Sequence, residues 1–145
     1  MATTEHPSFV NAKTVMFAID KGRPFDEYKH LVQDGATFSA QAPALEDITT
    51  VQAWGAWMKN FVEHIGPDLQ VEIKSLAWDE ERRTACMFAV YHATHTGDGG
   101  PVPATNKMTH TDCVYVLKMN NENKVEHFYK IWNDTFCMTE LGWTD

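Results

Sequence analysis

The chain has 145 residues, a formal net charge of −8 at pH 7 and 43% apolar residues. This length and composition are typical of one globular core, so we expect residues 1–145 to form a single domain. The acidic charge, without any cluster of Lys and Arg, argues against nucleic acid or an anionic membrane as a partner. The first residues show no secretory signal pattern, which predicts a cytoplasmic protein.

Apolar residues at helical spacing dominate the first part of the chain. They predict a helix from Ser8, its expected N-cap, to Gly22, and a shorter helix from Pro24 to Asp34-Gly35. A short strand is expected over residues 37–40. The third predicted helix has the clearest apolar stripe, which consists of Val51, Trp54, Met58, Phe61 and Ile65 and ends before Gly66-Pro67.

After Pro67 the apolar pattern changes from a period of 3.6 to a period of 2. Strands are predicted over residues 69–78, 84–96, 106–119 and 124–134, followed by a helical turn over residues 135–141. Helices followed by successive strands indicate an α+β fold, with three N-terminal helices packed on one face of an antiparallel sheet. The other face is also apolar, and a homodimer through the sheet would cover it.

Several short motifs resemble one known family. They are His95-Thr96-Gly97, a Gly-Pro loop through Pro103, Asn106-Lys107, and a last strand that ends in Trp132-Asn133-Asp134. Their order and spacing resemble the SnoaL-like branch of the NTF2-like superfamily along essentially the whole chain. Asn133 departs from the family pattern, since Trp and Asp are usually adjacent there.

The resemblance implies a cone of helices closed by a strongly curved sheet, with a pocket for a small hydrophobic molecule. Family members include polyketide cyclases, ketosteroid isomerases and dehydratases, which work without a cofactor. Other members carry ligands or bind proteins, so a non-catalytic hydrophobic-ligand carrier and an NTF2-type protein-binding module stay open as alternatives. The first hypothesis is a cofactor-independent enzyme that transfers a proton on an apolar, carbonyl-bearing substrate.

The resemblance assigns the catalytic base to Asp134, because cyclase members use an Asp on the last strand. An Asp at this point of the chain can equally cap the final helix. If residues 121–123 form a three-residue loop, antiparallel pairing places His110 opposite Asp134, with Asp112 and Trp132 as the next pair. With a two- or four-residue loop, Thr109 takes that place and His110 points away. His110 and Asp112 can also be ordinary polar residues near a sheet end or at a dimer contact.

The expected substrate-binding residues are mainly aromatic. We expect Trp54 and Trp57 from the third helix, His95, and the alternating residues Phe128, Lys130 and Trp132 of the last strand to line the pocket. The same aromatic residues can instead be plain core. Three cysteines without a CxxC pair are expected to be small buried residues, and no metal site is expected.

Overall fold

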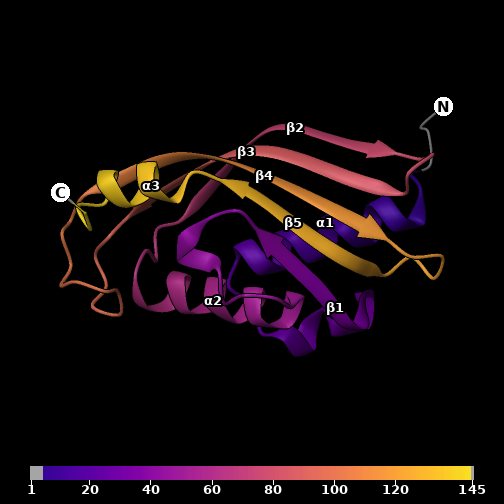
Figure 1. The fold of residues 1–145 in the computed structure, drawn as a ribbon, viewed down its shortest axis with the longest axis horizontal. Helices are drawn as coiled ribbons and strands as arrows, with labels where there is room; N and C mark the ends of the chain where they lie inside the picture. The colour runs from indigo at the N-terminus through magenta and orange to yellow at the C-terminus, as the bar shows by residue number, and fades with distance from the viewer. Residues whose placement is uncertain (1–4, 145) are drawn as a thin grey trace.

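The computed structural model describes residues 5–144, which form three α-helices and one five-stranded sheet (Figure 1). The sheet lies over α1 and α2, while the short α3 packs on β4 near one end of the sheet (Figure 1). The strand order is β1-β5-β4-β3-β2. The bounds of the elements are α1 (Pro7–Asp20), β1 (Val32–Ala40), α2 (Val51–His64), β2 (Gln70–Asp79), β3 (Thr84–Thr94), β4 (Met108–Met119), β5 (Val125–Trp132) and α3 (Asp134–Glu140).

The two long helices form where the sequence predicts them. The stripe of α2 is buried against the sheet, and Thr50 caps the helix by accepting a hydrogen bond from the backbone amide of Ala53. The first helix ends at Asp20, and Gly22 follows the C-cap Lys21 with a φ of 69°, a conformation that suits glycine. Its N-cap is His6 and not Ser8, because the His6 ring accepts from the backbone amide of Ser8.

The second predicted helix, after Pro24, was wrong. Two 3₁₀ turns, Phe25–Glu27 and Lys29–Leu31, take its place, and β1 already begins at Val32. Between the turns Tyr28 adopts a φ of −130°, which interrupts helical hydrogen bonding while its ring is buried in the core. The third α-helix of the described chain is therefore the C-terminal one.

The predicted strands are confirmed, but the sheet is mixed and not wholly antiparallel. Strands β2 to β5 pair antiparallel in chain order, whereas β1 pairs parallel with β5. Along the chain, α2 connects β1 to β2. Because this connection is long, β1 does not have to form a hairpin with the next strand, and it can pair in parallel with β5 at the edge of the sheet. The predicted strand over residues 37–40 is the second half of β1.

The turn between β4 and β5 has the predicted three-residue loop, yet the register further along differs from the expectation. Met119 pairs with Val125, as the loop requires, but the register then shifts at a bulge so that Lys118 pairs with His127. The shift persists to the last pair, Cys113 with Trp132. A one-residue shift changes which residue of β4 lies opposite each residue of β5. It therefore changes the cross-strand partner of every β5 residue after the bulge.

Alternate residues of the strands meet α1 and α2 in one large core, with a smaller cluster of Phe61, Ile65 and Ala93 beside it. The inward residues of β3 and β4 include small side chains beside large aromatic ones, and Trp54 of α2 lies fully buried among them. Among the described residues, no helix is long and apolar enough to cross a membrane. Near α3, a cavity lies between α2 and the sheet.

Candidate functional site

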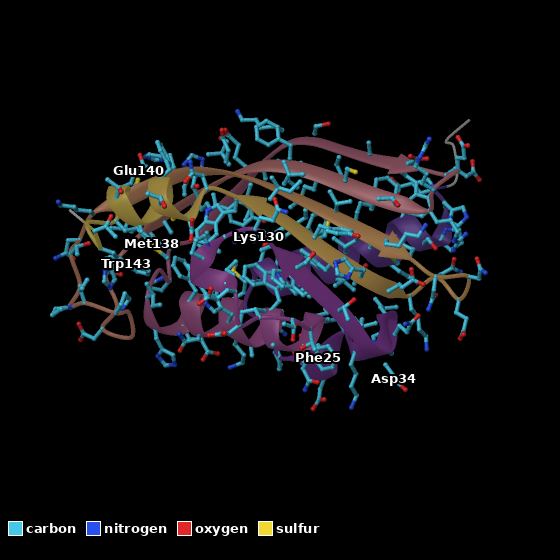
Figure 2. The ribbon with its side chains drawn as sticks, viewed as in Figure 1. Phe25, Asp34, Lys130, Met138, Glu140 and Trp143 are labelled. Atoms are coloured by element: carbon cyan, nitrogen blue, oxygen red, sulfur yellow. The ribbon has the colours of Figure 1, made fainter. Side chains whose placement is uncertain are left out.

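A small cavity of about 40 Å³, partly open to solvent, lies between α2, the inner face of β3 to β5, and α3. Met138 and Trp143 lie at the α3 end of the molecule, and Lys130 lies further along β5 (Figure 2). Most of the wall is apolar, and the polar lining groups are few. The apolar wall consists of Trp57, Met58, Phe61, Leu69, Ala93, Trp132, Met138, Leu141 and Trp143; the polar groups are Tyr91, Thr109, Thr111, Cys113, Lys130 and Cys137.

Lys130 brings an amine into this apolar surrounding. Its side chain is buried, and Nζ lies 3.9 Å from the ring centre of Trp132 and 4.3 Å from that of Trp54. The Trp57 ring centre is 5.7 Å away. Burial lowers the pKa of Lys130, because the charged form loses its hydration. The indole faces favour the ammonium form but do not replace that hydration.

A buried carboxyl stands behind the cavity wall. Asp20, the last residue of α1, accepts hydrogen bonds from the Tyr91 hydroxyl at 2.7 Å and the Tyr115 hydroxyl at 2.8 Å. Burial raises the pKa of Asp20 from its ordinary 3.8 to about 7, although both hydroxyls partly oppose the increase. Tyr91 also lines the cavity, so it connects the cavity wall to a carboxyl that can gain or lose a proton near neutral pH.

His95 supports the cavity wall from outside. The Trp143 indole donates from Nε1 to His95 Nδ1 at 2.8 Å, so Nδ1 carries no proton and the neutral ring bears it on Nε2. His95 is fully buried, and its Nε2 has no hydrogen-bond partner within residues 5–144. The structure therefore places His95 next to a lining residue and not in the lining itself.

Asp134, the expected base, is buried at the first turn of α3. One carboxylate oxygen accepts from the backbone amide of Ala44 at 2.8 Å, and the other accepts from the amide of Thr135. The side chain that caps α3 is Asn133, which accepts from the amide of Phe136. Asp134 thus joins α3 to the segment before α2, and it is not part of the cavity lining.

The expected His110–Asp134 pair is not formed. The shifted register ends with Trp132, so Asp134 lies beyond the paired part of β5, and His110 instead pairs with His92 of β3. The His110 and His92 rings meet with their centres 4.7 Å apart. Both His110 and Asp112 are exposed, while the alternate residues of β4 are buried. They lie on the outer face of the sheet, opposite the cavity.

The expected substrate-binding residues divide into two groups. Trp57, Lys130 and Trp132 line the cavity, whereas Trp54 and Phe128 are fully buried core residues beneath it. Trp54 and Phe128 are therefore plain core residues, the alternative to pocket lining that the sequence left open. Trp54 still affects the cavity indirectly, since it stacks on Trp57 and contacts Lys130.

The sequence interpretation missed Asp20 and Tyr91. Asp20 lies four residues after Met16, on the buried side of α1, so a carboxyl within an apolar stripe was an available signal. Tyr91 occupies an inward position of β3 between Ala89 and Ala93. Its role depends on the meeting of α1 with β3, which no local pattern shows.

The cysteines are only partly as expected. Cys113 and Cys137 are buried at the cavity, but Cys86 is exposed. Burial raises the pKa of the Cys113 thiol to about 12, which keeps it protonated and a poor nucleophile. Within residues 5–144, no three His, Cys, Asp or Glu side chains lie close enough together to hold a metal ion.

No family model matches the chain, and no curated protein matches it. Solved structures do. AclR from Streptomyces galilaeus, a candidate hydroxylase, is 19% identical with a TM-score of 0.71, over 95% of this chain and 86% of that one. A candidate polyketide cyclase from Acidithiobacillus ferrooxidans is 14% identical with a TM-score of 0.73, over 99% of this chain and 100% of that one.

A third structure, from Catenulispora acidiphila, has a ketosteroid isomerase-like fold and was solved with trimethylamine. It is 14% identical with a TM-score of 0.65, over 97% of this chain and 96% of that one. A candidate SnoaL-like polyketide cyclase from Jannaschia sp. CCS1 matches with a TM-score of 0.72 at 14% identity, over 99% of this chain and 100% of that one. At these identities the likeness concerns the fold alone, and this chain shares the fold of these SnoaL-like and ketosteroid isomerase-like structures, as its sequence predicted.

Proposed function

We propose that the protein is a small-molecule enzyme of the cyclase or isomerase type, which moves a proton at the carbon next to a carbonyl group. The observation that carries the proposal is the connection between the cavity wall and a buried carboxyl, Tyr91 to Asp20. The mostly apolar wall favours an apolar substrate, and Lys130 is a polar group that can face its carbonyl.

The proton moves through two hydrogen-bonded groups. When the substrate gives its proton to the Tyr91 oxygen, Tyr91 passes its own proton to Asp20 in the same step. No phenolate accumulates, which is consistent with the strongly raised pKa that burial gives to Tyr91. The pKa of Asp20, about 7, suits both removal and return of a proton near neutral pH. In this proposal Asp134 positions α3 and is not the base.

Exchange of 1-indanone protons in D₂O tests this function. Proton NMR follows loss of the signal next to the carbonyl, with and without protein. We expect the protein to accelerate exchange above the buffer rate, and Tyr91→Phe to reduce the acceleration by about 100-fold, since general acid–base groups contribute at least that much. The matched control is Tyr129→Phe, because Tyr129 is exposed on the outer face.

Two results would contradict the proposal. One is wild-type exchange at the buffer rate although tryptophan fluorescence shows that 1-indanone binds. The other is an equal loss of exchange in the Tyr91 and Tyr129 variants. Binding without any exchange would favour the alternative, a carrier of hydrophobic ligands, which the mostly apolar wall also suits.

We also infer that a second copy of the chain covers the outer face of the sheet. Helices α1 and α2 lie on the other side (Figure 1). The outer face carries a continuous apolar patch, because its members are cross-strand partners. The patch consists of Phe88, Val114, Val116, Tyr129 and Ile131, of which Ile131 is 61% exposed.

A further inference from the structure

We propose that Lys130 is a nucleophile that captures the carbonyl carbon of the ligand as an imine inside the cavity. The proposal rests on the proposed function, because it requires a carbonyl-bearing ligand in the same cavity. It adds a covalent step to that function. It also assigns to Lys130 a role that the other lining residues do not have.

The position of Lys130 supports this role. Its side chain lies on the inner face of β5, lines the cavity and is only 6% exposed. A buried lysine with a purely structural role normally pairs with a carboxylate. No carboxylate of residues 5–144 lies within ion-pair distance of Nζ, and the nearest described contacts of Nζ are the indole faces of Trp132 and Trp54.

The surroundings of the amine include four other titratable groups. Cys113 from β4, Cys137 and Asp134 from α3, and Asp20 from α1 all act on Lys130. Their negative forms would favour the ammonium ion, but burial outweighs them and lowers the pKa of Lys130. Burial therefore increases the share of the Lys130 amine that is neutral, and only the neutral amine has a lone pair to attack a carbonyl.

The step balances without any further reactant. The Lys130 nitrogen forms a bond to the carbonyl carbon, and the carbon–oxygen double bond opens to a carbinolamine. The oxygen then leaves as water together with the two hydrogens of the neutral amine, and a carbon–nitrogen double bond remains. Hydrolysis by one water molecule reverses the step and restores the lysine.

An imine at Lys130 would help the proton transfer next to it. When protonated, its nitrogen withdraws electrons from the neighbouring carbon more strongly than the carbonyl oxygen does, so that carbon loses a proton more easily. The Tyr91–Asp20 pair reaches the same cavity and can accept this proton. The cavity would thus hold both the electron-withdrawing group and the base.

Reductive trapping tests the proposal. The folded protein is treated with benzaldehyde and sodium cyanoborohydride at about pH 7, where exposed lysines are mostly protonated. Intact-mass spectrometry counts the reduced benzyl adducts, and peptide mapping locates them. We expect Lys130 to form its adduct several-fold faster than Lys74, because burial lowers the pKa of Lys130 and so makes more of its amine neutral.

Two variants serve as controls. Lys130→Met removes the amine and keeps an unbranched side chain of similar size, and it should lose the fast adduct. Lys74→Met removes a lysine that is paired with Glu72 at the surface, and it should keep the fast adduct. Near-ultraviolet circular dichroism checks that the tryptophans around position 130 stay packed; if Lys130→Met unfolds, site mapping of the wild-type adduct alone decides.

The proposal is overturned if Lys130 reacts no faster than Lys74 in the folded wild-type protein. Its failure is distinct from failure of the proposed function. If Lys130 is not labelled but 1-indanone still exchanges in a Tyr91-dependent way, the imine is wrong and the proton transfer stands. If Lys130 is labelled but no exchange occurs, the imine stands and the proton transfer is wrong.

Discussion

The buried carboxyl of Asp20 should make the protein less stable as the pH rises from 3.8 to about 7. In the unfolded chain this group has its ordinary pKa of 3.8, whereas in the folded protein burial raises it to about 7. Between these two values the folded protein holds a proton that the unfolded chain has lost. Folding therefore becomes less favourable with increasing pH across that window.

Asp20→Asn removes this effect and imitates the protonated acid. The amide can accept from one tyrosine hydroxyl and donate to the other, as a neutral carboxyl would. The gap between 3.8 and about 7, at about 1.4 kcal/mol per pH unit, corresponds to about 4 kcal/mol. We expect the variant to be about as stable as wild type near pH 4 and more stable by up to that amount near pH 8.

Urea unfolding, followed by tryptophan fluorescence at steps from about pH 4 to about pH 8, measures the difference. Subtracting the two curves removes every titrating group that does not interact with Asp20. The reasoning is refuted if the two curves run parallel, or if wild type gains stability over Asp20→Asn as the pH rises. Exchange of 1-indanone by the same variant should be slower, since the proton acceptor is lost.

Three further substitutions test other parts of the account. Gly97→Ala places a Cβ in a steric clash with the backbone carbonyl oxygen of His64, so urea unfolding should show a loss of about 2 kcal/mol or more. Asp134→Asn weakens the link to Ala44 and should cost about 1 kcal/mol of stability without changing 1-indanone exchange; a large loss of exchange in a folded variant would return the base to Asp134. Ile131→Glu should convert a dimer to a monomer in light scattering, and a wild-type monomer would contradict the outer-face interface.

The sequence predicted the elements whose own periodicity decides them. The α2 stripe and the four strands after Pro67 follow directly from the spacing of apolar residues, and all are confirmed. The segment around Tyr28 has helical spacing as well, but there the burial of one ring against α2 outweighs a weak local preference. The parallel pairing of β1 is a tertiary choice that a strand pattern does not contain.

The candidate site was less predictable, because it depends on register and on contacts between distant elements. The bulge between Lys118 and Met119 changes the pairing by one residue, and β5 ends at Trp132, so His110 does not lie opposite Asp134. Trp57, Lys130 and Trp132 were predictable, since their alternation or helical spacing points them inward. The meeting of Asp20 with Tyr91 joins residues 71 positions apart, and only the three-dimensional packing reveals it.

A crystal structure of the protein soaked with 1-indanone tests the central claim most directly. The account predicts that the ketone lies in the cavity against Trp57 and Trp132, with its carbonyl group next to Lys130 or Tyr91. An empty cavity at saturating 1-indanone, or a ketone bound only on the outer face of the sheet, would contradict it.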